Sequence, residues 1–250
     1  MAAAVTPLVA GAFGDLAHWL GTGANWTGDG GILFRTGQHL VITGEALGLA
    51  LLVALPVGLT LGHLGRGGLA AINVSNIGRA VPTLGLLILL ASWDSVGVGN
   101  EAAVLALMFF AIPPILTNTY VGMTAVDRDV KEAARGMGMT GVQLLRKVEL
   151  PLALPLVAAG IRTAVVQVIA TATLAAVVGS GGLGRFVYDG FSTHQPGVYL
   201  GGATVVIALA VLVEAVLGRL QRALERRLGR SPAADVPQRE AAEAQLTPVP

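Results

Sequence analysis

Five stretches of the chain are apolar over about twenty residues each, and they restrict the possible folds most strongly. They cover residues 40–62, 69–93, 102–123, 154–178 and 198–218. An α-helix rises about 1.5 Å per residue, so roughly 20 apolar residues cross the hydrocarbon core of a bilayer, about 30 Å thick. The sequence therefore predicts an all-α integral membrane protein with about five transmembrane helices.

The composition excludes most other classes. Hydrophobic residues make up 54% of the chain and charged residues only 12%, whereas a soluble domain carries roughly twice that charged fraction. The chain has no cysteine, which excludes a disulfide framework and a cysteine nucleophile. Its four histidines share no ligand spacing, and no G-x-x-x-x-G-K-[ST] sequence occurs. We therefore expect no catalytic residue, metal site, cofactor or nucleic-acid partner in this chain.

Basic residues gather on one side of the five-span arrangement. The connection between the third and fourth stretches, the segment after the fifth stretch and Arg66 together hold twelve of the sixteen Lys and Arg residues. The opposite side holds Arg35 and Arg185. By the positive-inside rule the crowded side is cytoplasmic. We expect a multi-pass membrane protein with its amino terminus outside and its carboxyl terminus in the cytoplasm.

The chain divides into three predicted parts. Residues 1–38 contain Trp19 and Trp26, which favour the membrane interface and indicate an extracytoplasmic segment. Residues 39–220 form the transmembrane domain. Residues 221–250 begin with arginines and end in a segment rich in Ala, Pro and Glu, which predicts a basic and then disordered cytoplasmic tail.

Residues 124–153 form a cytoplasmic loop for which the sequence predicts two short helices and a bend. Asp127 is a suitable helix cap, and Gly138 permits a bend. Thr140 and Gln143 have the spacing of a capping box, which begins a second helix. We expect that helix to end near Leu150, because a proline follows it.

The same loop carries a sequence pattern with fixed gaps. Glu132-Ala133-Ala134 is followed after three residues by Gly138, and after nine more by Val148-Glu149-Leu150-Pro151. This resembles the EAA loop of ABC importer permeases, which reads E-A-A, three residues, G, nine residues, I-x-L-P. The chain departs from that pattern only by valine in place of isoleucine at position 148.

The resemblance implies a permease of the type I ABC importer kind, whose loop is a coupling helix that docks on a separate ATPase. That ATPase, rather than this chain, would bind ATP. The other implied partners are a second copy or a related permease, an extracytoplasmic solute-binding protein and the lipid bilayer. The residues expected at the coupling surface are Glu132, Ala133, Ala134, Arg135, Gly138, Val148, Leu150 and Pro151.

Further segments are similar to the osmoprotectant branch of this family, which imports glycine betaine, choline, carnitine or proline compounds. They are residues 24–28, 76–83, 118–122, 134–140 and 179–184. Two alternatives stay open. One is another small solute, similar to ergothioneine or methionine, and the other is a secondary transporter or channel that needs no ATPase.

Several residues within the apolar stretches are candidates for the translocation path or its gate. They are Arg79, Pro82, Asn118, Tyr120 and Gln167. A charge near the bilayer centre costs about 2.5–3.5 kcal/mol, so Arg79 is expected to act as a gate or to pair structurally with Glu45. Pro82 is expected to kink its helix, and Gln167 to face the path or to bond across helices.

Two further expectations concern the fourth stretch and the segment that follows it. Arg162 is expected to extend toward the cytoplasmic surface. The glycine-rich run 179–184 is expected to form a turn that leads into a re-entrant or surface helix over residues 185–191.

Overall fold

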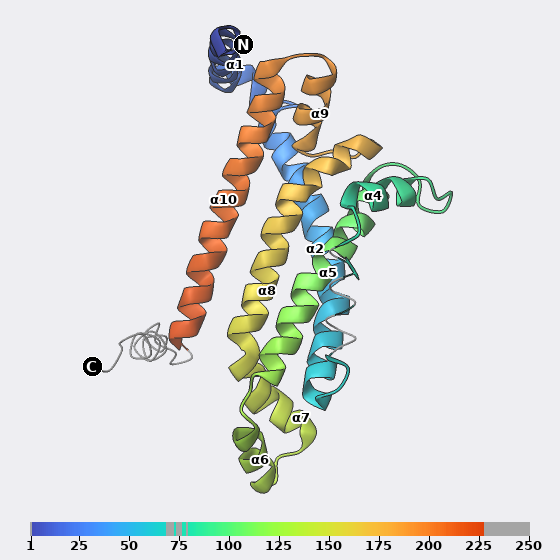
Figure 1. Cartoon of the computed structure of the whole chain (residues 1–250), viewed down its shortest axis with the longest axis vertical. Helices are drawn as coiled ribbons and strands as arrows, with labels where there is room; N and C mark the ends of the chain where they lie inside the picture. The colour runs from blue at the N-terminus through green and yellow to red at the C-terminus, as the bar shows by residue number, and fades with distance from the viewer. Residues whose placement is uncertain (1, 69–72, 74–76, 79, 228–250) are drawn as a thin grey trace, which may run out of the picture.

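The computed structural model describes residues 2–68, 73, 77–78 and 80–227, and every secondary-structure element within them is helical (Figure 1). The elements, in chain order, are α1 (Ala2–Gly21), the 3₁₀ helix η1 (Gly23–Asn25), α2 (Ile32–Leu64), α4 (Thr83–Ala91), α5 (Asn100–Thr124), α6 (Arg128–Gly136), α7 (Gly141–Leu144), the π-helical turn η2 (Leu145–Glu149), α8 (Leu150–Thr171), the 3₁₀ helix η3 (Ala172–Val178), α9 (Gly184–Ser192) and α10 (Pro196–Arg227). The predicted all-α fold is confirmed.

Four helical stretches of the described residues are long and apolar enough to cross a membrane. They are Ile32–Leu64, Asn100–Thr124, Gly141–Val178 and Pro196–Arg226. They contain the first, third, fourth and fifth of the predicted spans. Helix α2 begins well before residue 40, so the predicted boundary between residues 38 and 39 lies inside it. The polar side chains of Arg35 and Gln38 end the apolar run in the sequence, but both residue types favour helical backbone.

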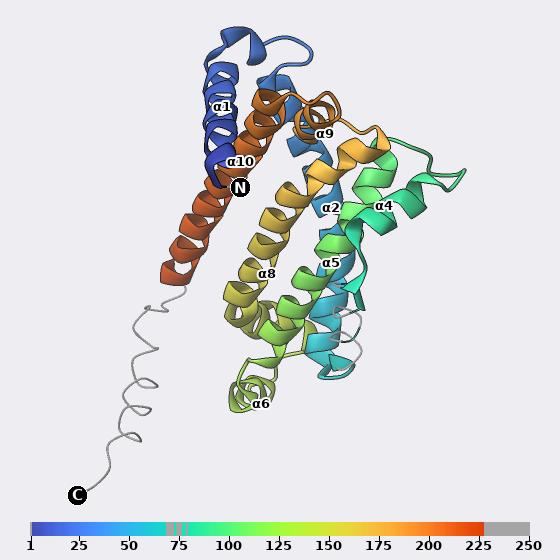
Figure 2. The ribbon, with the colours of Figure 1, turned by 45° about the horizontal axis from the view of Figure 1, so that its top comes forward.

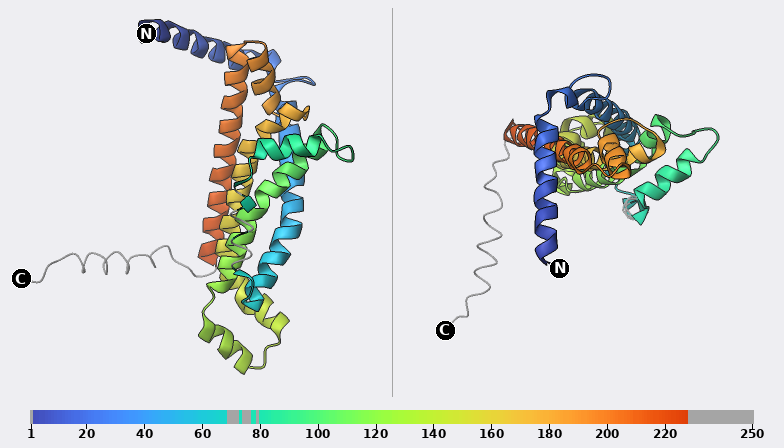
Figure 3. Two further views of the ribbon diagram at one scale, coloured as in Figure 1. Left: turned by 45° about the vertical axis from the view of Figure 1, so that its right-hand side comes forward. Right: turned by 90° about the horizontal axis from the view of Figure 1, so that it is seen from above.

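The second predicted span, residues 69–93, is described only in part. Its described helix, α4, has nine residues, which at about 1.5 Å per residue is too short to cross a bilayer. The residues just before α4 are not helical, and Pro82 is its N-cap, so the predicted break at Pro82 is confirmed. Figure 3 shows α4 steeply inclined to the long helices. Residues 69–72, 74–76 and 79 lie outside the described residues.

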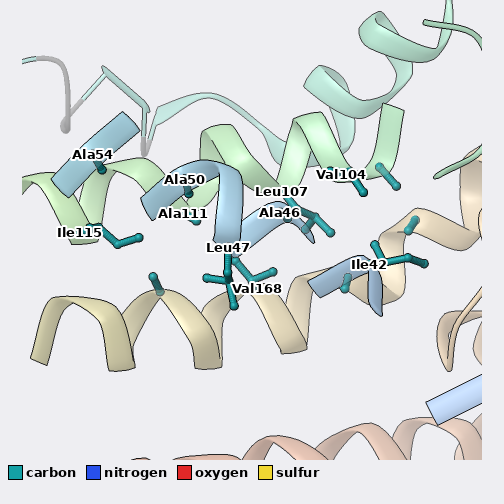
Figure 4. Close-up of a cluster of buried hydrophobic side chains, with 14 of the residues drawn as sticks. Ile42, Ala46, Leu47, Ala50, Ala54, Val104, Leu107, Ala111, Ile115 and Val168 are labelled. Carbon is teal, nitrogen blue, oxygen red and sulfur yellow. The ribbon is translucent and has the colours of Figure 1, made fainter. Parts of the chain in front are cut away.

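Helices α2, α5 and α8 form the central core, and small residues allow them to approach closely (Figure 4). Ala46, Ala50 and Ala54 recur every fourth residue of α2, so they share one face of that helix, and all three are buried. Leu107 of α5 and Val168 of α8 pack in the same cluster. Packing between small residues stabilises helix pairs in a bilayer, where the hydrophobic effect gives no driving force.

Glycines of α2 bring the C-terminal halves of α2 and α5 close together. A Cβ atom built on Gly58 would lie 2.8 Å from Cβ of Thr119. One built on Gly62 would lie 2.3 Å from Cβ of Met123. Real Cβ atoms do not approach so closely, so these positions exclude a larger residue unless the helices separate.

Helices α10, α1 and α9 lie outside this core. Helix α10 packs on α8 and α9 and runs the length of the bundle (Figures 1 and 2). Helix α1 extends away from the end of α10 (Figure 3), where the Trp19 ring meets Gly201 and lies edge-on to Phe186 with ring centroids 5.2 Å apart. The helix predicted over residues 185–191 is confirmed as α9.

A polar contact joins α8 to α10. The Arg162 guanidinium is paired with the Glu214 carboxylate and also donates to Oε1 of Gln221 at 3.1 Å. Both partners lie on α10. The sequence predicted that Arg162 would extend toward the cytoplasmic surface. That prediction stays open; in the structure the charge of Arg162 is matched by the neighbouring helix.

Candidate functional site

Helices α6 and α7 form a bent hairpin that projects from one end of the bundle, which we call the loop end (Figure 1). Asp127 caps α6, because its Oδ1 accepts a hydrogen bond from the backbone N–H of Asp129 at 2.7 Å. A side-chain oxygen at this position satisfies a donor that has no partner within the helix. The predicted start of the first loop helix is therefore confirmed.

The bend of the hairpin lies at Gly138, whose φ of +82° is in the left-handed region. The chain then re-enters a helix through the predicted capping box. The backbone N–H of Thr140 donates to Oε1 of Gln143 at 2.9 Å, and the N–H of Gln143 donates to Oγ1 of Thr140 at 3.4 Å. Local sequence chemistry thus defines both arms and the bend.

The E-A-A residues occupy different sides of α6. Glu132 accepts from Nε of Arg128 at 2.8 Å in an exposed pair one turn apart. Ala133 and Arg135 are exposed, whereas Ala134 is buried. The hairpin therefore presents a charged and small-residue surface on one side and packs with the other.

Two large apolar side chains next to the bend are exposed. Met137 is 73% exposed and Val142 is 61% exposed. Gly138, between them in the chain, is also exposed. An apolar surface at the tip of a polar hairpin is the kind of feature that marks an interaction site.

The predicted end of the second loop helix near Leu150 is wrong. The chain stays helical from α7 through the π-helical turn η2 into α8, and Pro151 lies in the first turn of α8. The backbone N–H of Leu150 donates to the carbonyl of Leu145, five residues earlier. Proline lacks the N–H of a regular helical hydrogen bond, and the helix accommodates it next to the irregular, π-helical hydrogen bonding of η2. Val148, Leu150 and Pro151 are half-buried in this transition.

Sequence reasoning missed the ionic contacts of Glu149, which is 0% exposed. Its Oε2 lies 2.5 Å from Nδ1 of His63 on α2, and its Oε1 lies 3.4 Å from Nζ of Lys131 on α6. A buried carboxylate is rare unless it is paired. The acidic residue within the apolar run Val148–Pro151 was a signal that such partners exist, but no local pattern pointed to a histidine 86 residues away.

The candidate path residues lie in several places. Arg79 lies outside the described residues. Pro82 is exposed at the start of α4, and next to it a hollow of about 230 Å³ is lined by residues of α4 and α5 and of the segment before α4. Gln167 is exposed on α8. Their assignment to a translocation path stays a prediction.

Asn118 and Tyr120 contact neighbouring segments of the same chain. The Asn118 amide donates to the Pro114 carbonyl at 2.8 Å, and a Cβ on Gly160 of α8 would lie 2.5 Å from Cβ of Asn118. The Tyr120 ring packs against Gly68, where a Cβ would lie 2.1 Å from the phenolic oxygen. Both residues thus contribute to helix packing, and their predicted place in the path stays open.

A hollow of about 260 Å³ at the end opposite the loop is lined by residues of η3, α9 and α10, including the rings of Tyr188, Phe191 and Tyr199. The Arg185 guanidinium already lies over the Tyr188 ring, 5.9 Å from its centroid. It also pairs with Asp189 at 2.9 Å. Within the described residues, no group of three or more His, Asp or Glu side chains is placed to hold a metal ion.

Long membrane helices around a small-residue core, with a bent hairpin at one end, define a multi-pass membrane protein of the permease class. The family of binding-protein-dependent transport system inner membrane components matches residues 47–230. The chain belongs to this family. The resemblance drawn from the hairpin motif is thereby confirmed.

Named relatives match most of the chain. It is 40% identical over 196 residues to the glycine betaine/carnitine/choline transport system permease protein OpuCB of Bacillus subtilis, covering 78% of this chain and 89% of the relative. It is 39% identical to the choline transport system permease protein OpuBB of the same species, covering 79% and 90%. It is 35% identical to the osmoprotectant import permease protein OsmW of Salmonella typhimurium, covering 74% and 88%.

Solved structures give the same fold. A chain of the MetNI methionine ABC transporter in an inward-facing conformation matches with a TM-score of 0.68 at 25% identity, covering 77% of this chain and 96% of that one. A chain of an amino acid ABC transporter matches with a TM-score of 0.62 at 21% identity, covering 78% and 93%. The architecture is that of a type I ABC importer permease.

Proposed function

We propose that this chain is the membrane-spanning permease subunit of an ATP-driven importer of small osmoprotectants such as glycine betaine, choline, carnitine or proline. The observation that carries the proposal is the exposed bent hairpin α6–α7 with its E-A-A and L-P residues. The names of the relatives support the solute class. A separate ATPase supplies the chemistry of ATP hydrolysis.

The hairpin docks on that ATPase. Met137 and Val142 offer apolar contact area on either side of the Gly138 bend, while Glu132 and Arg135 offer charged partners. When the ATPase subunits close around ATP, the docked hairpin moves with them and tilts the spans. Such a cycle needs contacts that differ between the two states, because equal affinity for both would shift nothing.

The loop end is the cytoplasmic end in this proposal. Arg128, Lys131, Arg135, Arg146 and Lys147 all belong to the hairpin and the turn that follows it. The positive-inside rule assigns such a cluster to the cytoplasm. The amino terminus then lies outside the bacterial cell membrane, where a solute-binding protein delivers its cargo, and the carboxyl terminus lies inside.

A second copy or a related permease completes the translocation path. Glu45 of α2 and Gln167 of α8 are exposed within membrane-spanning helices. Polar and charged groups are expensive to expose to lipid, so we expect protein or a water-filled path to cover them. Arg79, Pro82, Asn118 and Tyr120 are the other candidates for this path.

Reconstitution in proteoliposomes with the ATPase and the binding protein tests the proposal. We expect uptake of labelled glycine betaine, choline or carnitine that requires ATP inside the vesicles. Uptake driven by an ion gradient without the ATPase would instead support a secondary transporter. Uptake competed by methionine or ergothioneine and not by betaines would keep the importer and change its solute.

A variant pair tests the docking surface. Glu132→Lys reverses a charge on the exposed side of α6, so we expect loss of ATPase co-purification and of uptake. Asp29→Lys makes the same change at an exposed position at the other end and should preserve both. Equal behaviour of the two variants would contradict the docking role of the hairpin.

A further inference from the structure

A buried carboxylate ties the hairpin to a helix that is not its neighbour in the chain. Glu149 lies at the last position of η2 and is fully buried. Oε2 lies 2.5 Å from Nδ1 of His63, in the last turn of α2, and Oε1 lies 3.4 Å from Nζ of Lys131 on α6. We call Glu149, His63 and Lys131 the loop-end triad.

The triad also reaches α5 and the start of α7. Lys131 donates to the backbone carbonyl of Met123 at 2.9 Å, near the end of α5. A Cβ on Gly141 would lie 3.5 Å from Nε2 of His63, so the ring is in contact with the start of α7. One cluster of side chains therefore joins both arms of the hairpin to the ends of two membrane helices.

The direct polar link to α2 is made by this triad. The hairpin is joined to α5 through residues 125–127 and to α8 through the continuous helix at η2. Helix α2 has no such chain connection. Within the part of the chain that the structure describes, the contact of His63 with Glu149 is a direct polar link between α2 and the helical turn that follows the hairpin.

The π-helical geometry of η2 also indicates that the position of Glu149 matters for function. A π turn is rare; it occurs mostly as a single turn within an α-helix, and such turns are frequent at functional sites. Glu149 closes that turn, and its side chain is held from two other elements. A turn held in this way transmits displacement of α7 to α8 and α2 together.

We propose that Glu149 is a positioning residue that makes α2 move with the hairpin when the ATPase closes. This rests on the proposed importer function. Neutralising the carboxylate leaves the charge of Lys131 without its buried partner and weakens the bond to His63. Without the triad the hairpin still reaches α5 and α8 through the chain, and α2 follows only through its packing against those two helices.

The test uses the complete importer with its ATPase and binding protein. Glu149→Gln keeps the side-chain shape and removes the charge. We expect the ATPase to co-purify as with the unaltered chain, while solute transported per ATP hydrolysed falls roughly tenfold, within the usual range of coupling effects. Glu225→Gln is the matched control, because Glu225 accepts from Gln221 on α10, away from the triad. It should leave the ratio unchanged.

A mutant cycle separates positioning from simple loss of stability. His63→Leu should lower the transport ratio as Glu149→Gln does, and the double variant should be no worse than either single one, because partners in one interaction are not additive. His63→Asn retains a polar group near the position of Nδ1 and should restore part of the ratio. Additive losses would overturn the proposal.

The remaining outcomes are distinguishable. If the unaltered chain shows no ATP-dependent uptake, the proposed function fails and the inference with it. If Glu149→Gln transports with the normal ratio, the importer stands and the positioning role is wrong. If Glu149→Gln no longer binds the ATPase, the residue only folds the docking surface, which also overturns the inference.

Discussion

The α2–α5–α8 core and the α6–α7 hairpin use small residues for different structural reasons. In the core, helices meet through alanines and glycines, and a Cβ at Gly62 would lie 2.3 Å from Cβ of Met123. In the hairpin, Gly136 and Gly138 have no atom within 4 Å of an added Cβ. The structure of the core depends on the volume of the side chains where helices meet. The structure of the hairpin depends on backbone conformation and on its helix caps.

This difference fits the two tasks. A core with little free volume moves as a unit, because close-packed interiors transmit displacement rather than absorb it. A hairpin with open surroundings leaves room for another protein to cover it. Substitutions that change size should therefore harm the core most, and substitutions that change backbone preference should harm the hairpin most.

Gly62→Val should have the largest effect on stability. The added side chain has no space against Met123, and overpacking costs about 1–3 kcal/mol. We expect a lower unfolding temperature in detergent. Gly48→Val is the control on the same helix, since an added Cβ there meets no atom within 4 Å. Equal unfolding temperatures for the two variants would contradict the close contact of α2 with α5.

Gly138→Ala should destabilise the hairpin although it adds only one methyl group. Gly138 lies in the left-handed region, where the conformation of a residue with a Cβ costs about 1–2 kcal/mol of free energy. Gly136→Ala, two residues earlier on α6, should instead gain up to about 1 kcal/mol of helix propensity. Hydrogen exchange of the α6 and α7 amides measures both. A shift of the same sign in the two variants would mean that the bend does not require glycine.

Thr140→Ala removes one half of the capping box and should cost about 1 kcal/mol. In the unaltered chain the Gln143 amide donates to the Thr140 hydroxyl. We expect faster hydrogen exchange of this amide in the variant, because that acceptor is removed. The rest of the bundle should be unaffected. Thr124→Ala is the comparison, because that hydroxyl bonds carbonyls of its own helix and caps no free donor. Similar exchange at residue 143 in both variants would argue against the capping box.

The sequence predicted those features that depend on neighbours in the chain. Apolar length located four spans, and the Asp127 cap, the Gly138 bend and the Thr140 capping box all depend on residues a few positions apart. The continuation past Leu150 was missed, because Pro151 was read as a helix end, whereas the chain continues as a helix through the π-helical turn that precedes this proline. The partners of Glu149 and Arg162 were missed because they come from distant segments, and only the packing of helices brings them together.

Met137→Ser should have the smallest effect on stability. It therefore tests whether the exposed hairpin, unlike the core, serves binding rather than folding. Met137 is 73% exposed, and surface substitutions usually change the free energy of unfolding by no more than about 0.5 kcal/mol. The affinity of the Met137→Ser chain for the ATPase should nevertheless fall, because the variant lacks an apolar side chain at the proposed docking surface. Binding of the purified ATPase to the variant in nanodiscs measures this. Ser92, exposed far from the hairpin and bonded to its own helix, gives a control as Ser92→Ala. Unchanged affinity in Met137→Ser would mean that the exposed tip is not the surface that the ATPase covers.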